Sequence, residues 1–237
     1  MLFRSPTITS GTLATGDSAT WTQSFDTKAV GIGKTLTPTG VVTDGNGGND
    51  YEVTFVTATG SITAKELTID GLSGVSRSYD GTTGATATGT PALVGVVGSD
   101  DVTLGGTPVY TFASKHVGAP VSIGTTGFTI SGTDAGNYSL TQPTLSASIT
   151  ARELTVTGAT AAGKVYDGTT SATVDTTGAT LSGVIGSDDV TLGVAGVTAT
   201  FADAAAGIGT TVTFAGFTIS GTAAGDYSLS QPMTTAS

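Results

Sequence analysis

The sequence predicts an all-β fold, organised as a rod-like tandem array of small antiparallel β-sandwich-like modules of about 87 residues. Three observations support this prediction. Threonine, whose β-branched side chain suits strands better than helices, is the most frequent residue of the 237-residue chain. Glycine, which favours turns and weakens helices, contributes 36 residues. Long segments also recur in the same order 87 to 89 residues apart.

The repeat divides the chain into three modules. Four pairs of segments recur in order: 64–69 (AKELTI) and 151–156 (ARELTV), 78–83 (SYDGTT) and 165–170 (VYDGTT), 98–104 (GSDDVTL) and 186–192 (GSDDVTL), 127–132 (GFTISG) and 216–221 (GFTISG). A diverged copy lies upstream, where Tyr51 precedes Tyr138 by 87 residues. We therefore place a partial module at 6–64, a complete one at 65–151, and one that lacks its last strand at 152–237. Residues 1–5 (MLFRS) fit no module and are interpreted as a non-native leader.

Each complete module contains several short segments in which apolar and polar residues alternate. In the third module the apolar positions are Leu154 and Val156, then Val197, Ala199 and Phe201, then Val212 and Phe214, Phe217 and Ile219, and Tyr227 and Leu229. Alternation with a period of two indicates half-buried strands, and the glycine and aspartate clusters between them indicate turns. No segment has the pattern of an amphipathic helix. A β-solenoid is the alternative, but its coils repeat at about 20–30 residues.

The links between modules contain no flexible spacer. Residues 61–69 (SITAKELTI) and 148–156 (SITARELTV) have no glycine or proline, so a closing strand continues almost directly into the next opening strand. Such short extended links favour a stiff rod over beads on a flexible string. Neighbouring repeats of the same chain are therefore the first partners that we expect.

Composition excludes several functions. A net charge of −10 with only 8 lysines and arginines argues against nucleic-acid binding. No run of 18 apolar residues exists, so we expect no membrane span in these residues. With no cysteine and a single histidine, His116, the chain cannot form thiolate metal sites or a recurring Ser-His-Asp triad. We expect no enzyme activity and no catalytic residues.

Three motifs of the third module carry a family resemblance. Residues 165–170 (VYDGTT), 181–190 (LSGVIGSDDV) and 221–229 (GTAAGDYSL) resemble the YDG repeat, which occurs in tandem in bacterial exoproteins related to filamentous haemagglutinin, many exported by two-partner secretion. The resemblance spans the second and third modules, and the first is similar to the second half of a diverged copy. It implies stalk repeats of a secreted or surface-anchored adhesin. Such a stalk would project a distal binding region for cell adhesion or biofilm formation.

Two Tyr-Asp-Gly motifs are the first candidate sites. Tyr79 and Asp80 in the second module correspond to Tyr166 and Asp167 in the third. Turn chemistry accounts for these residue types, because aspartate bonds its own backbone and glycine adopts positive φ. The functional alternative is a tyrosine platform with a carboxylate that binds glycan.

Paired carboxylates are the second candidate. Asp100 and Asp101 correspond to Asp188 and Asp189. Adjacent residues of a strand point to opposite faces, which is poor geometry for a general acid–base pair. Oxygen ligands suit calcium, so the alternatives are a polar loop and a calcium site. We accordingly expect no cofactor other than calcium. The alternative to a stalk is that the repeats themselves bind glycan or matrix polysaccharide, including that of a host surface, with or without calcium.

Overall fold

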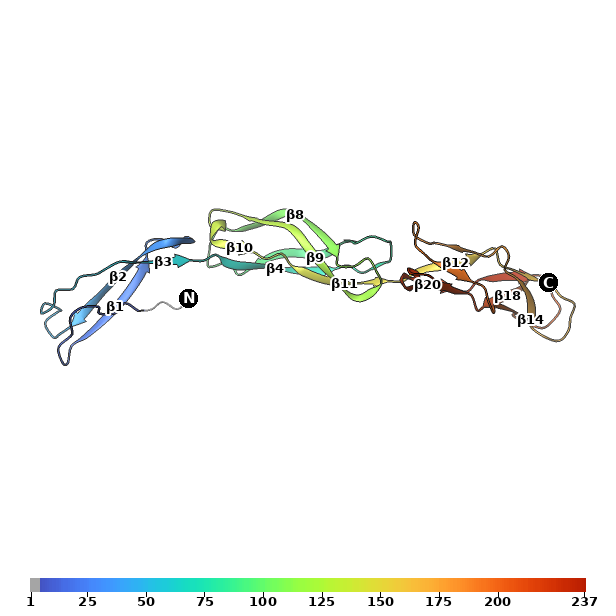
Figure 1. The fold of residues 1–237 in the computed structure, drawn as a ribbon, viewed down its shortest axis with the longest axis horizontal. Coiled ribbons are helices and arrows are strands. Elements are labelled where there is room, and N and C mark those ends of the chain that lie inside the picture. The colour runs from blue at the N-terminus through green and yellow to red at the C-terminus, as the bar shows by residue number, and fades with distance from the viewer. Residues whose placement is uncertain (1–4) are drawn as a thin grey trace. The chain divides into compact units, whose positions relative to one another are not determined.

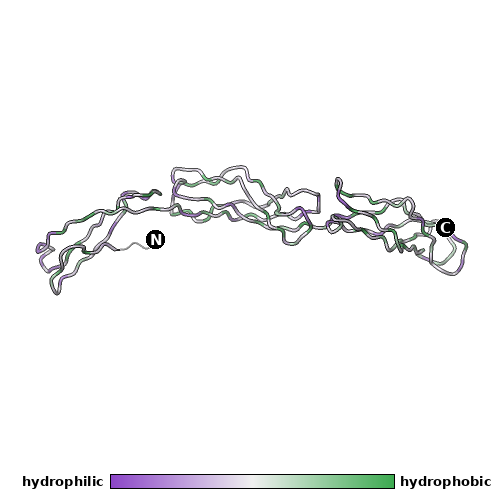
Figure 2. The backbone as a smooth tube through the Cα atoms, in the orientation of Figure 1, coloured by the Kyte–Doolittle hydropathy of each residue, from purple (hydrophilic) through white to green (hydrophobic). Residues whose placement is uncertain are grey.

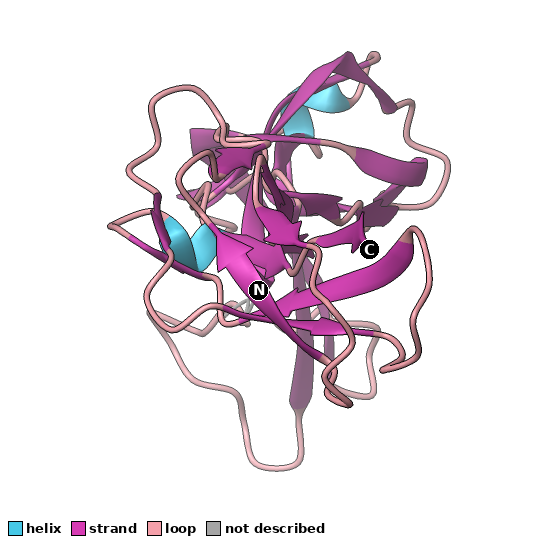
Figure 3. Cartoon of the chain, turned by 90° about the vertical axis from the view of Figure 1, so that its right-hand side faces the viewer, coloured by secondary structure: helices cyan, strands magenta, loops and turns pink. Residues whose placement is uncertain are grey.

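A computed structural model describes residues 5–237, so the leader interpretation for residues 1–5 lies, except for Ser5, outside the described residues. The predicted all-β fold is confirmed (Figures 1 and 3). Within the described residues, the helical elements are two single 3-10 turns, η1 (Ala135–Asn137) and η2 (Ala224–Asp226). No helix in that part of the chain is long and apolar enough to cross a membrane.

The strands are β1 (Ser18–Phe25), β2 (Gly31–Thr43), β3 (Ala58–Ile62), β4 (Lys65–Gly74), β5 (Arg77–Ser78), β6 (Gly84–Ala85), β7 (Ala87–Val94), β8 (Thr103–Phe112), β9 (Gly118–Ser131), β10 (Tyr138–Leu140), β11 (Thr144–Thr150), β12 (Arg152–Thr157), β13 (Thr160–Ala162), β14 (Ser171–Asp175), β15 (Thr180–Ser182), β16 (Thr191–Gly193), β17 (Thr198–Phe201), β18 (Thr210–Ala215), β19 (Thr218–Ser220), β20 (Tyr227–Ser230) and β21 (Met233–Ala236). They form several small sheets of two to five strands, and the structure shows no solenoid among residues 5–237.

Strand formation follows the alternation of the sequence. Along β12, Leu154 and Val156 are buried, whereas Glu153, Thr155 and Thr157 are exposed. Along β18, Val212 and Phe214 are buried in the same way. In Figure 2, short hydrophobic stretches, coloured green, are accordingly separated by pale or purple stretches along the backbone. A period of two places one set of side chains on the core face and leaves the threonine hydroxyls in water.

The described residues fall into two compact units. The first contains residues up to Ile69 together with Ala92–Gly106 and Phe128–Thr141. Its antiparallel sheet has the order β1-β2-β3. Another sheet has the order β10-β4-β7, in which β10 runs parallel to β4 and Leu140 lies opposite the fully buried Leu67.

The second unit contains Asp70–Pro91, Thr107–Gly127 and Gln142–Ser237. It holds a three-stranded sheet with the order β15-β12-β20, in which β12 is central and pairs in parallel with β20. Next to it lies the sheet β13-β14-β17-β18-β21. Most ladders are antiparallel, as predicted, and the short parallel ladders join segments that are far apart in the sequence.

Candidate functional site

The tyrosine of the first Tyr-Asp-Gly motif lies in a buried contact between repeats. β5 pairs in parallel with β11, and the Tyr79 amide that follows β5 donates to the Thr150 carbonyl at 2.9 Å. The Tyr79 side chain is fully buried. Its hydroxyl donates to Oδ2 of Asp188, 109 residues further along the chain, at 2.8 Å. Two residues that the sequence assigned to separate candidate sites therefore meet.

Asp188 accepts a second hydrogen bond from a tyrosine of its own repeat. The Tyr227 hydroxyl donates to the same Oδ2 atom at 2.6 Å and accepts the Ile185 amide at 3.0 Å. The rings of Tyr79 and Tyr227 make an edge-to-face contact with 5.3 Å between centroids. The hydrogen bonds from Tyr227 and Tyr79 hold the pKa of Asp188 below its usual value. Burial and the bond to Asp188 raise the pKa of Tyr79.

A second polar contact lies at the same junction. Asp226, at the end of η2, is only 4% exposed. Its Oδ1 accepts the Val117 amide at 2.8 Å, and its Oδ2 lies 2.7 Å from Nδ1 of His116. A buried carboxylate is costly unless it is hydrogen-bonded, and here both oxygens have partners from the preceding repeat.

Apolar side chains enclose these polar contacts. One hydrophobic cluster joins Tyr79, Phe112, Ile123, Ala147 and Ile149 of the second module with Leu154 and Tyr227 of the third. The junction between residues 151 and 152 therefore lies within a continuous core instead of a solvated linker. Arg77 also covers the ring of Phe112, with its guanidinium carbon 5.3 Å from the ring centroid.

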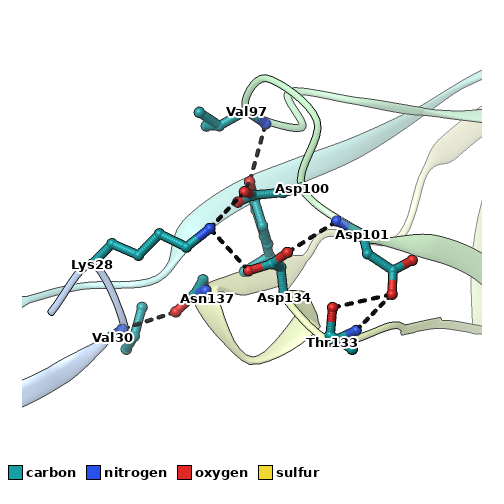
Figure 4. Close-up of polar contacts among 9 residues, drawn as sticks. Lys28, Val30, Val97, Asp100, Asp101, Thr133, Asp134 and Asn137 are labelled. Atoms are coloured by element: carbon teal, nitrogen blue, oxygen red, sulfur yellow. Dashed lines mark hydrogen bonds and ion pairs between the residues drawn. The ribbon is translucent and has the colours of Figure 1, made fainter.

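An equivalent junction in the first unit uses a lysine (Figure 4). The Lys28 ammonium lies 2.9 Å from Oδ1 of Asp100 and 3.1 Å from Oδ1 of Asp134. The Val30 amide donates to Oδ1 of Asn137 at 2.9 Å. Hydrogen bonds from Lys28 and then from Tyr138 lower the pKa of Asp100, and the same bond to Asp100 raises the pKa of Lys28.

Within the described part of the chain, one hydrogen-bond relay occurs three times. In each copy a backbone amide donates to a tyrosine hydroxyl, and that hydroxyl donates to an aspartate. The three relays are Ala14–Tyr51–Asp17 (2.8 and 2.5 Å), Val97–Tyr138–Asp100 (3.0 and 2.8 Å) and Ile185–Tyr227–Asp188 (3.0 and 2.6 Å). Asp17 therefore occupies, in the diverged copy, the place of the first aspartate of the Ser-Asp-Asp motif.

The other residues of the Tyr-Asp-Gly motifs lie in turns. Asp80 accepts the Thr82 amide at 2.9 Å and pairs with Arg77. Asp167 likewise binds Lys164 at 2.8 Å and a following backbone amide, which together lower its pKa to about 2. Tyr166 differs from its counterpart, because it is 67% exposed. A glycan site at these residues stays a prediction, and only the second copy presents its tyrosine to solvent.

The second aspartate of each pair closes a turn. Asp101 accepts the Thr133 amide at 3.0 Å, and Asp189 accepts the Thr222 amide at 2.9 Å. Neighbouring aspartates thus serve different partners. Among residues 5–237 no cluster of three or more Asp, Glu, His or Cys side chains is arranged to hold a metal ion. The calcium site stays a prediction.

Sequence reasoning missed Lys28, His116, Asn137 and Asp226. Lysine and histidine side chains in loops give no signal of their partners. The other two carried a weak signal, because Asn137 and Asp226 occupy the same place in two repeats, directly before a tyrosine. Both accept a backbone amide from the preceding repeat.

The sequence matches a known family of repeats. No curated protein and no solved structure matches the chain. The family model of the YDG domain matches it twice, over residues 63–145 and 150–235. Each match contains a Tyr-Asp-Gly turn and a tyrosine–aspartate relay of the kind described above. Since the matches together cover more than half of the chain, it belongs to the YDG domain family.

Proposed function

We propose that these repeats form a structural stalk of a secreted or surface-anchored bacterial adhesin, which projects a distal binding region for cell adhesion or biofilm formation. The observation that carries the proposal is the junction in the second unit. There Asp188 joins a tyrosine of the preceding repeat to one of its own repeat, inside a continuous apolar core. The stalk acts outside the cell and has no catalytic role.

A stalk must resist bending where its parts meet, and the junction has the means to do so. Tyr79 bound to Asp188 and Val117 bound to Asp226 are two separate anchor points. Two such contacts beside a shared core restrain the movement of one repeat against the next about the single connecting strand. A flexible linker would have none of these contacts and would be rich in glycine and serine.

The rigidity can be measured within the second unit. The chain has no cysteine, so Thr126→Cys and Thr213→Cys give two unique attachment sites for spin labels on exposed strand positions. We expect a narrow distance distribution by pulsed electron paramagnetic resonance. Tyr79→Ala should broaden it, whereas Tyr166→Ala, at the exposed copy of the motif, should not. A broad distance distribution in the labelled chain that keeps Tyr79 would contradict the stalk.

The predicted rod and the adhesive context need their own tests. Small-angle scattering of the whole chain should give the profile of a rod, and a compact, nearly spherical particle would refute that expectation. In the parent adhesin, deletion of repeats should reduce attachment of cells while leaving ligand binding by the isolated distal region unchanged. Equal attachment after deletion would show that reach is not the role of the repeats.

A second candidate function rests on Tyr166. This ring is 67% exposed and lies next to Asp167, so an aromatic surface and a carboxylate are both available to a sugar. A glycan array with and without calcium tests this candidate. Saturable binding that is lost in Tyr166→Ala would assign a binding role to the repeats themselves, and calcium dependence would support the metal site.

A further inference from the structure

The chain enters the third module through a strand that pairs in parallel with one of the last strands of the same module. β12 begins at Arg152, only one residue after β11 ends, and it is the first strand of the module. In the described residues β20 is followed only by β21. Arg152–Thr155 lie opposite Tyr227–Ser230, and Figure 1 labels the two strands next to each other. The ladder between β12 and β20 therefore joins the beginning of the module to its end.

The parallel direction of these strands decides how tension acts on their ladder. Tension along the chain pulls β12 backwards at Arg152 and pulls β20 forwards at Ser230. Because both strands run in the same direction, the two forces point in opposite directions along the strands, and the strands must slide past each other. The hydrogen bonds of the ladder cross from strand to strand, so sliding loads all of them at the same time. A pull on two neighbouring ends would instead break them one after another.

Further contacts hold β12 against sliding. It is the central strand of its sheet, with β15 on the side opposite β20. Leu154 is 0% exposed and Val156 is 6% exposed, and the Arg152 Nε group donates to the Gly183 carbonyl at 2.9 Å. Before β12 can slide, it must leave both neighbouring strands and withdraw two buried side chains from the core.

β20 is held at both of its ends. At its beginning, the Tyr227 hydroxyl is bonded to Asp188 and to the Ile185 amide, as described above. At its end, the Ser230 hydroxyl donates to the Leu154 carbonyl of β12 at 3.3 Å. The strand that receives the forward pull is thus bonded to β12 and to the loop that carries Asp188.

The same pairing occurs in the first unit. There β10 runs parallel to β4, with Lys65–Leu67 opposite Tyr138–Leu140. The Thr141 amide extends this ladder by donating to the Leu67 carbonyl at 2.9 Å. In both repeats the strand that begins the module is paired with the strand that begins at the relay tyrosine, so the arrangement belongs to the repeat itself.

We propose that β12 and β20 form a mechanical clamp, which makes the repeat resist tension applied along the chain, and that β4 and β10 form the equivalent clamp in the first unit. Bearing tension is a function beyond that of a spacer, because a spacer needs only length and stiffness. The use of the clamp in the cell rests on the proposed stalk function, since a stalk transmits the pull between its distal region and the cell.

The test pulls on the third module of the whole chain from different pairs of residues. The chain has no cysteine, so substitutions to cysteine give unique attachment sites for DNA handles in optical tweezers. Glu153→Cys with Met233→Cys pulls β12 and β20 at opposite ends and shears the ladder. Thr157→Cys with Met233→Cys moves one attachment site along β12 and pulls the two strands at neighbouring ends. All three positions are exposed.

The sheared variant should resist unfolding more strongly than the variant that is pulled at neighbouring ends. Each additional hydrogen bond that must break at the same moment slows unfolding by about fivefold. At equal force we therefore expect the sheared variant to unfold more than about tenfold more slowly. Release of about 250–280 Å of chain identifies unfolding of the segment between the attachment sites. Equal unfolding rates, or slower unfolding of the second variant, would overturn the proposal.

A third variant pulls the two strands at their other pair of neighbouring ends. Glu153→Cys with Gly225→Cys does this, and an added Cβ at Gly225 would meet no atom within 4 Å. This variant should unfold as readily as the one attached at residues 157 and 233. Resistance equal to that of the sheared variant would show that the ladder is not the barrier, and would overturn the clamp.

Urea denaturation without force provides the control for stability. The three variants should have the same midpoint, since their substitutions lie at exposed positions. Unfolding rates under force that follow the urea midpoints instead of the direction of the pull would overturn the clamp. The cell-attachment test of the stalk is a separate measurement. Its failure beside a clear effect of pulling direction would remove the stalk alone, whereas equal rates in all three variants would remove the clamp alone.

Discussion

Removal of one hydroxyl group tests whether the junction of the second unit stabilises the fold. Tyr79→Phe keeps the fully buried ring and its edge-to-face contact with Tyr227, but it removes the 2.8 Å hydrogen bond to Asp188. A hydrogen bond to a charged group contributes about 1.5–3 kcal/mol. Asp188 keeps the bond from Tyr227, so no charge is left without a partner. We therefore expect the free energy of unfolding to fall by about 1.5–2 kcal/mol, near the lower end of that range.

The chain offers a matched control for this substitution. Tyr166→Phe makes the same chemical change in the same motif, but at a ring that is 67% exposed. A surface change of this kind alters stability by about 0.5 kcal/mol or less. Urea denaturation at neutral pH, followed by circular dichroism, measures both variants under identical conditions. Hydrogen exchange of the Val117 amide, which lies at the same junction, reports whether the loss is local.

A double-mutant cycle tests whether the loss of stability in Tyr79→Phe comes from the hydrogen bond to Asp188. If the Tyr79 hydroxyl acts through Asp188, then Tyr79→Phe should cost less in an Asp188→Asn background than in the original chain. Additive losses would refute the bond as the cause. Equal stability of Tyr79→Phe and Tyr166→Phe would refute the larger inference that this junction stabilises the repeats.

Two further predictions concern the same junction, and a third concerns the turn that Asp189 closes within the third module. Asp226→Asn should leave stability nearly unchanged in thermal unfolding, because Asn137 occupies the equivalent place. Asp226→Ala should cost about 1–3 kcal/mol, because it removes the buried charged acceptor of the Val117 amide. Since hydrogen bonds lower the pKa of Asp188 in the folded state, its contribution is present above the unfolded value near 3.8 and is lost as the pH falls through the folded value. Acid titration of unfolding should show this loss, and Asp188→Asn should reduce it. Gly221→Ala should destabilise the chain in urea, because Gly221 has φ +114° and an added Cβ would lie 2.3 Å from the Asp189 carbonyl oxygen. Unchanged midpoints in Asp226→Ala or Gly221→Ala, a clear loss of stability in Asp226→Asn, or an acid titration that Asp188→Asn leaves unaltered would contradict these expectations.

The strands were predictable from sequence because their signal is local. Alternation correctly predicted that Leu154, Val156, Val212 and Phe214 face a core, and each is buried. The sequence has no amphipathic helical pattern, and the helical elements of the described residues are two single 3-10 turns. Thr125 is an exception to the pattern, because it is 7% exposed although its side chain is polar.

The contacts between repeats were not predictable from one sequence. Tyr79 and Asp188 are separated by 109 residues, and each has a sufficient local explanation as part of a turn. The parallel pairing of β12 with β20 joins the beginning of one module to its end. A turn motif in the sequence predicts pairing of adjacent strands only, so it does not predict this contact. The relay also identifies Asp17 and Tyr51 as the counterparts of the aspartate and tyrosine in the other two modules. These two residues form the same hydrogen bond although the sequence around them differs.

The shared aspartate has a consequence for how such genes change. The Tyr79 junction takes its tyrosine from one repeat and its aspartate from the next. Recombination between repeat-coding segments that keeps the reading frame and the 87-residue phase therefore joins a tyrosine-bearing end to an aspartate-bearing end again. Gain or loss of whole repeats regenerates a complete junction, whereas a crossover out of phase leaves a buried hydroxyl or carboxylate without its partner.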